Sequence, residues 1–254
     1  MPGEWLDALR AVARRMREEL LDFSSRTPPP RDAARAKELE KEADGLACRA
    51  LLEGLEEAGL SCILVCEDLG VREIGSPGPE GPFLVVDPLD GTRNFTRGVQ
   101  IASISMALCD GPDLAGLREG LVLDIFSGRE FWAVRGEGAF SDGRPIRVAE
   151  TEDLSKAVLS IDQSRAPEAD WVPVVVGHVD AVRQLGSASL ELCLVASGVL
   201  DGHIDLRGRI RIVDVAAGLL IAREAGACAW PVSYTHLRAH ETEADLVCRL
   251  LLEK

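Results

Sequence analysis

The chain has 254 residues, which is enough for one large or two small domains with a sizeable hydrophobic core. Its 42 acidic residues outnumber its 28 lysines and arginines, and the formal net charge of −14 argues against a nucleic-acid-binding surface. Because no apolar run approaches the roughly 20 residues of a membrane span and the N-terminus lacks the pattern of a signal peptide, we expect a soluble, cytoplasmic protein with neither nucleic-acid nor membrane partners.

Two helices are predicted before residue 60. The proline-rich residues 24–31 predict a loop, and a second helix is predicted over residues 32–58, ending at Gly59 as a C-cap. Before that loop, apolar side chains recur at helical spacing and predict an amphipathic helix over residues 4–23: Trp5, Leu9, Val12, Met16 and Leu20.

Two short apolar strands follow, and each of them ends in a carboxylate. Residues 62–66 predict a buried strand that stops before Glu67 and Asp68, and residues 83–86 predict another that stops at Asp87. The backbone at the end of a strand is rigid and holds its side chain in place. Glu67 alone also suits a turn or capping role, but two successive strands that deliver carboxylates indicate a built site.

The turn that begins at Asp87 has the most informative sequence in the chain. Pro88 is expected to end the strand pairing, and Gly91 permits an unusual turn, so Asp90 folds back beside Asp87. Two crowded carboxylates repel each other unless a cation lies between them, and hard oxygen ligands suit Mg²⁺. The simpler interpretation is that Asp-Pro and Asp-Gly are common turn formers.

The complete string Asp-Pro-Leu-Asp-Gly-Thr-Arg-Asn-Phe over residues 87–95 resembles the signature of the inositol monophosphatase family. Over residues 1 to 230 the resemblance implies an α+β fold, a layered αβαβα sandwich of the inositol monophosphatase and fructose-1,6-bisphosphatase type. It also implies a phosphatase that uses two or three Mg²⁺ ions, and homodimers are common in the family. Asp44 resembles a supporting family aspartate, although the threonine that precedes it there is absent and a solvated charge is an equally good interpretation.

Strands dominate residues 102–148, with a hairpin turn at Ser127-Gly128. Residues 151–153 mark a plausible boundary, after which strands and helices alternate. We therefore predict an N-terminal α+β metal-binding portion over residues 1–150 and a C-terminal α/β substrate portion over residues 151–230.

The second portion adds one more carboxylate. Asp214 falls in the first turn of a helix predicted over residues 211–226, where an aspartate is usually a cap. The Asp-x-Ala-Ala-Gly stretch around it is similar to the second signature of the family, which implies a metal ligand. Val213 departs from that signature, which commonly has Trp, and this bears on substrate subclass more than on metal binding.

Two further segments are candidates for substrate binding. Small residues at 186–189 precede a helix whose N-terminus favours an anion or a hydroxyl group, although ordinary turn chemistry explains each of them equally well. Three arginines alternate at 207, 209 and 211 and share one face if the chain is extended. Such arginines resemble the archaeal-type dual inositol monophosphatase and fructose-1,6-bisphosphatase proteins and suit a second phosphate, while a solvated strand edge is as good an interpretation.

The resemblance assigns roles to these residues. Glu67, Thr92 and Asp90 are implied as catalytic, with Glu67 and Thr92 positioning the attacking water. The implied metal ligands are Glu67, Asp87, the Leu89 carbonyl, Asp90 and Asp214. The implied substrate-binding residues are Gly91, Thr92, Gly186, Ser187, Ala188, Arg207 and Arg209.

The expected substrate is inositol 1-phosphate or fructose 1,6-bisphosphate, and 3'-phosphoadenosine phosphate or another nucleotide phosphate is the alternative within the family. A phosphatase of the haloacid dehalogenase type would place its two acids two residues apart, whereas Asp87 and Asp90 are three apart. A non-catalytic, metal-binding regulatory protein is the alternative from another class. The presence of all four acids and Thr92 weighs against it.

The C-terminal residues are of a different kind. Residues 232–242 and 245–254 read as the translation of a transposon adapter from short-read sequencing, with a sample index between the two parts. We therefore expect residues 231–254 to be a non-native tail and the natural C-terminal end of the fold to be missing. For this reason His236 and His240 are not predicted to be a zinc pair. The seven cysteines lack a Cys-x-x-Cys pair and favour reduced buried thiols.

Overall fold

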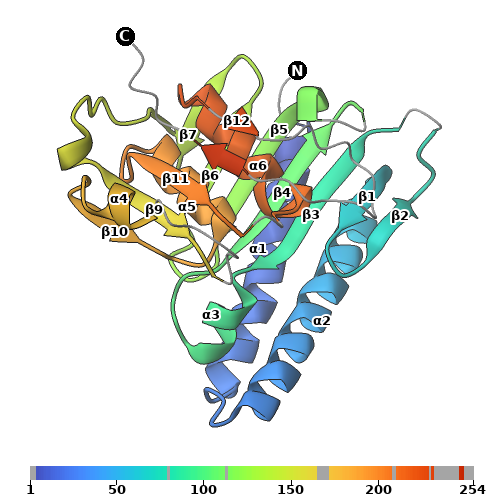
Figure 1. Ribbon diagram of the computed structural model, residues 1–254. Helices are drawn as coiled ribbons and strands as arrows, with labels where there is room; N and C mark the ends of the chain where they lie inside the picture. The colour runs from blue at the N-terminus through green and yellow to red at the C-terminus, as the bar shows by residue number, and fades with distance from the viewer. Residues whose placement is uncertain are drawn as a thin grey trace.

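The computed structural model describes residues 4–78, 81–111, 114–164, 172–207, 210–228, 230–231 and 246–248. Both predicted N-terminal helices are confirmed as α1 (Glu4–Arg26) and α2 (Ala33–Glu57), which pack side by side (Figure 1). Asp32 caps α2 by accepting a hydrogen bond from the Arg35 amide at 2.9 Å.

The larger of two sheets has eight strands in the order β2-β1-β3-β4-β5-β6-β7-β8. All neighbouring pairs are antiparallel except β1 and β3, which run parallel with Cys66 opposite Val86. This register makes Glu67 and Asp87 neighbours, because Glu67 directly follows Cys66 and Asp87 directly follows Val86. The strands are β1 (Cys62–Cys66), β2 (Gly70–Ile74), β3 (Phe83–Asp90), β4 (Ser103–Cys109), β5 (Leu117–Asp124), β6 (Glu130–Val134), β7 (Gly138–Ser141) and β8 (Arg144–Ile146).

The prediction that pairing ends at Pro88 is wrong. Asp87 pairs with Ser105, the register then shifts, and Asp90 pairs again with Ser103 of β4. A bulge of this kind accommodates proline because the extra residues need no ladder hydrogen bond from a backbone N–H. The bulge keeps both aspartates on β3 and turns them toward one region.

The smaller sheet has five strands in the order β10-β9-β11-β13-β12, with β9 parallel to both β10 and β11. Its last two strands include Pro231 and residues 246–248, which belong to the tail predicted to be non-native, and β13 pairs with β11 and β12. The origin of that tail stays a prediction. The strands are β9 (Val158–Asp162), β10 (Ala181–Arg183), β11 (Gly202–Asp205), β12 (Trp230–Pro231) and β13 (Leu246–Cys248).

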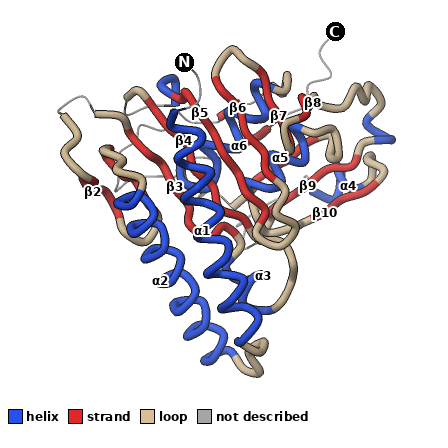
Figure 2. The backbone as a smooth tube through the Cα atoms, turned by 180° about the vertical axis from the view of Figure 1, so that it is seen from behind, coloured by secondary structure: helices blue, strands red, loops and turns tan. Residues whose placement is uncertain are grey.

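Helices separate and cover the sheets in layers (Figures 1 and 2). α1 and α2 cover one face of the larger sheet, and α5 (Ala188–Ala196) and α6 (Ile212–Glu224) cover the other face, between the two sheets. On the smaller sheet, Val175 of α4 (Val172–Val176) packs against a buried apolar cluster in and next to β9, formed by Ala157, Leu159 and Ile161. The predicted layered α+β architecture is therefore confirmed. The remaining elements are α3 (Thr92–Arg97) and the short 3₁₀ helices η1 (Leu114–Gly116) and η2 (Leu154–Lys156).

The central helices are buried nearly all round, as expected for helices between two layers. α6 lies directly on β5, since a Cβ atom added to Gly120 would be 3.0 Å from the Ala217 carbonyl oxygen. This close packing carries the start of α6, with Asp214, to the larger sheet. β8 ends at Ile146 and β9 begins at Val158, while the division into a metal-binding and a substrate-binding portion stays a prediction.

Two expectations about the described part of the chain concern its helices and thiols. None of the described helices is both long and apolar enough to cross a membrane. Cys228 is exposed, whereas the other described cysteines are buried, as predicted: Cys48, Cys62, Cys66, Cys109 and Cys193.

Candidate functional site

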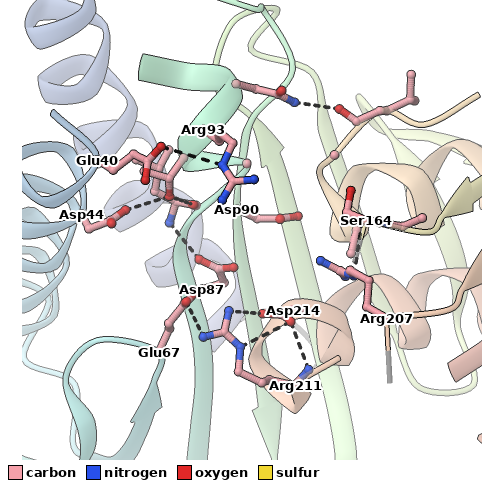
Figure 3. Close-up of a pocket in the computed structure, with 18 of the residues that line it drawn as sticks. Glu40, Asp44, Glu67, Asp87, Asp90, Arg93, Ser164, Arg207, Arg211 and Asp214 are labelled. Atoms are coloured by element: carbon pink, nitrogen blue, oxygen red, sulfur yellow. Dashed lines mark hydrogen bonds and ion pairs between the residues drawn. The ribbon is translucent and has the colours of Figure 1, made fainter. Parts of the chain in front are cut away.

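A cavity of about 860 Å³ lies where the two sheets and α2 approach the turn after β3 (Figure 3). This volume is within the usual range for small-molecule sites. Most of the predicted site residues line it. The lining comprises Glu40, Asp44, Glu67, Asp87, Leu89, Asp90, Gly91, Thr92, Arg93, Asn94, Asp162, Ser164, Gln184, Leu185, Gly186, Ala188, Arg207, Arg211 and Asp214.

Three carboxylates converge on one side of this cavity. Glu67, Asp87 and Asp214 each offer an oxygen atom within 4.8 Å of the other two. The parallel register of β1 and β3 pairs the first two, and the start of α6 supplies the third. Asp214 also fulfils the predicted capping role, because its Oδ2 accepts a hydrogen bond from the Arg211 amide at 3.0 Å.

The Asp87 carboxylate is almost completely buried, with 3% of its surface exposed. Burial, and then the negative charges of Asp90, Glu67 and Asp214, raise its pKa well above the usual value. Its Oδ1 accepts one hydrogen bond, from the Leu89 amide at 3.1 Å. A buried group with this excess of negative charge fits a site that holds a cation.

Asp90 is held by hydroxyl groups from α5 and the residue before it. Its Oδ2 accepts hydrogen bonds from the Ser187 hydroxyl at 2.8 Å and from the Ser189 amide and hydroxyl at 2.8 and 2.6 Å. Burial raises the pKa of Asp90 to about 6, although the Ser189 hydrogen bonds oppose this shift. Asp90 lines the cavity but lies outside the group of three closely spaced carboxylates among the described residues.

Thr92 and Asp44 form a polar pair on the other side of the turn. The Thr92 hydroxyl donates either to Asp44 Oδ1 at 2.7 Å or to the Leu89 carbonyl at 2.9 Å, because it has only one proton. Burial is the largest cause that raises the pKa of Asp44 to about 7. Of the two interpretations of Asp44, the contact with Thr92 favours a supporting role over a solvated charge.

Arg211 lies against the carboxylate group. Its guanidinium group donates to Glu67 Oε1 and, at 2.9 Å, to Asp214 Oδ1 (Figure 3). The Glu67 and Arg211 side chains are 29% and 41% exposed. An arginine therefore contacts two of the three carboxylates that are closest together.

The opposite end of the cavity belongs to the smaller sheet. Arg207 Nε is 2.8 Å from Asp205 Oδ2 and 3.3 Å from Asp162 Oδ2. Gln184 Nε2 donates to Asp162 Oδ1 at 3.2 Å and to Ser164 Oγ at 2.7 Å. Arg207 and Arg211 both line the cavity, whereas Arg209 lies outside the described residues.

The loop before α5 closes one wall of the cavity. Asn94 Nδ2 donates to the Leu185 carbonyl at 2.7 Å, and a Cβ atom added to Gly186 would be 3.2 Å from that nitrogen. Gly186 also has φ +80°, so glycine is suited to this position in two ways. Ala188 reaches the cavity, but the Ser187 side chain is fully buried and points to Asp90.

The residues fit a hard divalent cation. Carboxylate oxygens from Glu67, Asp87 and Asp214 are close enough to share one, with Asp90 and the Leu89 carbonyl beside them on the cavity wall. The donors are all oxygen atoms, which favours Mg²⁺, Mn²⁺ or Ca²⁺ over metals that prefer sulfur or nitrogen.

The protein is thus a layered α+β protein with an oxygen-rich cavity, and three carboxylates in that cavity could hold a metal ion. The model of the inositol monophosphatase family matches residues 4–247, and the chain belongs to that family.

Relatives with established names support the assignment. The fructose-1,6-bisphosphatase/inositol-1-monophosphatase of Methanothermobacter thermautotrophicus is 38% identical over 181 residues, which cover 68% of this chain and 64% of the relative. The fructose-1,6-bisphosphatase of Pyrococcus furiosus is 35% identical over 189 residues, covering 74% and 68%. The structure of inositol monophosphatase from Anabaena superposes with a TM-score of 0.74 at 26% identity and covers 96% of this chain and 90% of that one. The aligned regions thus span about two thirds of these curated relatives.

Several residues of the site were not predicted. In the sequence Arg211 stands out only as part of an arginine run, and Asp162, Ser164 and Gln184 carry no recognisable pattern. Ser189 was visible as a small residue before a helix, but its bond to an aspartate far away in the sequence was not. The signal available for Asn94 was its place in the nine-residue motif.

Proposed function

We propose that the protein is a Mg²⁺-dependent phosphate monoester hydrolase that acts on inositol 1-phosphate, fructose 1,6-bisphosphate or both. The observation that carries the proposal is the convergence of Glu67, Asp87 and Asp214 within 4.8 Å beside the Thr92–Asp44 pair. Membership of the family and the names of the relatives support it.

Glu67, Asp87, Asp90, Asp214 and the Leu89 carbonyl would hold the metal. Mg²⁺ bound there supplies positive charge to phosphate oxygens and lowers the pKa of a water molecule. The protein holds these oxygen atoms in fixed positions. Ser187 and Ser189, for example, hold the Asp90 carboxylate through three hydrogen bonds to its Oδ2.

Thr92 and Asp44 would position the attacking water. When the Thr92 hydroxyl donates to the Asp44 carboxylate, a lone pair of its oxygen remains to accept a hydrogen bond from water. Because the pKa of Asp44 is raised to about 7, that carboxylate can accept a proton near neutral pH. Water then attacks phosphorus in line with the ester oxygen and passes one proton to Asp44 as the phosphorus–oxygen ester bond breaks. The leaving alkoxide takes a proton from bulk water, and Asp44 later returns its proton to bulk water.

The backbone after Asp90 would bind the phosphate group. Gly91 has φ +90°, and a Cβ atom there would be 3.0 Å from the Ile101 carbonyl oxygen, so only glycine fits this turn without strain. The amides of Gly91 and Thr92 are proposed to donate to phosphate oxygens, as successive backbone amides do in anion-binding turns.

The test is release of inorganic phosphate from inositol 1-phosphate and from fructose 1,6-bisphosphate, with Mg²⁺ and with EDTA. Glu67→Gln is expected to lower kcat at least 100-fold, because it removes charge from a proposed metal ligand. Asp68→Asn is the matched control, since it changes the adjacent exposed acid and should retain activity. Absence of phosphate release from both esters, with the metal still bound, would refute the proposal and favour nucleotide phosphates first and then the non-catalytic alternative.

A further inference from the structure

The described lining of the cavity contains three arginines: Arg93, Arg207 and Arg211. Each of the last two contacts two carboxylates. Arg207 contacts Asp205 and Asp162, and Arg211 contacts Glu67 and Asp214. Their positive charges are therefore already balanced within the protein.

Arg93 has a different environment. The one ion pair recorded for it, over the described residues, joins its Nε to Glu40 Oε1 at 3.8 Å, and its side chain is 66% exposed. An ion pair this long and this exposed contributes little to stability. The guanidinium group can leave Glu40 at small cost and bind another anion.

The position of Arg93 is suited to a substrate. It directly follows Thr92 in the first turn of α3, and its guanidinium group points into the cavity above Asp90, with Glu40 on the far side (Figure 3). A phosphate group held at Gly91 and Thr92 would therefore leave the rest of its molecule within the same cavity as Arg93. The cavity volume of about 860 Å³ leaves room for a sugar with a second phosphate.

We propose that Arg93 is a specificity-determining residue that binds a second anionic group of the substrate, the second phosphate of a phosphorylated sugar. The inference rests on the proposed function and adds the residue that would distinguish a bisphosphate from a monophosphate substrate. A guanidinium group binds a phosphate through two parallel hydrogen bonds. Arg93 has no such pair of bonds with Glu40, whose Oε1 is 3.8 Å from Arg93 Nε. Arg207, for which a substrate-binding role is predicted, shares its charge between Asp205 and Asp162 and is less available to a second phosphate than Arg93.

The test compares ligand binding with turnover in the 254-residue chain. Isothermal titration calorimetry in Ca²⁺, with EDTA-treated protein, measures the dissociation constants of fructose 1,6-bisphosphate and inositol 1-phosphate without relying on turnover. Arg93→Ala is expected to weaken bisphosphate binding about tenfold and to change monophosphate binding by less than about threefold. Arg93→Lys should recover part of the loss. In Mg²⁺ the loss is expected in KM for the bisphosphate, with kcat within about threefold.

The control is Arg97→Ala, which removes an exposed arginine from the same helix outside the cavity and should leave both dissociation constants unchanged. Equal weakening of both ligands in Arg93→Ala would overturn the proposal. A bisphosphate loss in Arg207→Ala but not in Arg93→Ala would also overturn it and assign the second phosphate to the opposite end of the cavity. Selective loss of binding in a protein that releases no phosphate would support this inference while refuting the proposed hydrolase activity.

Discussion

Replacing Arg211 with alanine is expected to strengthen the binding of a divalent cation. The Arg211 guanidinium group donates to Glu67 Oε1 and to Asp214 Oδ1, so its positive charge lies beside two of the carboxylates that would bind a metal. A bound cation would compete with Arg211 for the negative charge of these groups and weaken both contacts. The Arg211→Ala protein has no such contacts to lose, and its backbone amide still caps Asp214.

The size of the effect follows from the two ion pairs. The Arg211 side chain is 41% exposed, so each pair contributes at most about 1 kcal/mol after solvent screening. The variant therefore avoids a cost of about 1–2 kcal/mol when the metal binds. Since 1.4 kcal/mol corresponds to a tenfold change in affinity, we expect Mg²⁺ to bind about 5 to 30 times more tightly.

Isothermal titration calorimetry with Mg²⁺ and Mn²⁺ measures this change directly. Arg207→Ala is the matched control, because it removes the same charge from the same cavity but contacts Asp205 and Asp162 instead. Long-range attraction alone should strengthen its metal binding no more than about twofold. Equal affinities in the wild type and Arg211→Ala, or equal gains in the two variants, would refute the reasoning.

Three further outcomes are expected. Thr92→Val should lower kcat about 100-fold and Thr92→Ser far less, in phosphate-release assays; similar rates in both would show that the hydroxyl is not needed. The raised pKa values of Asp44 (about 7) and Asp90 (about 6) mean that these groups hold protons in the folded state after the unfolded chain has lost them. Their contribution to the free energy of unfolding of the metal-free protein should therefore fall as the pH rises from about 4 to 7, while Mg²⁺ affinity rises; urea denaturation that shows no such decrease would contradict this. Gly218→Ala should destabilise the protein by about 1–2 kcal/mol, because the new Cβ would be 2.8 Å from Leu192 Cβ; an unchanged melting temperature would exclude this clash.

The parts of the site that depend on local sequence could be predicted. The strand that carries Asp87, the turn at Gly91 and the helix that begins near Asp214 follow from apolar periodicity, glycine and capping preferences within short windows. The assignment of these residues to a metal site needed the whole signature, because each fragment alone is an ordinary turn or cap.

The parts that depend on tertiary contacts could not be predicted. The register of β1 against β3 makes Glu67 and Asp87 neighbours, and no local pattern contains that register. Arg207 lines the cavity, and its predicted role in substrate binding stays a prediction; its contact with Asp162 of β9 is a tertiary contact that no local pattern contains. Ser187 was expected to touch substrate, but the packing of α5 directs its side chain to Asp90 instead.

The packing of α6 on β5, with Ala217 against Gly120, means that the carboxylate group is assembled from distant parts of the chain. Glu67 and Asp87 come from the first strands, whereas Asp214 arrives with a helix made much later in synthesis. A nascent chain therefore lacks the three-carboxylate group until α6 has left the ribosome and docked. Cleavage between β8 and β9 would leave two fragments that each hold part of that group, so a divalent cation would act as a cross-link between them.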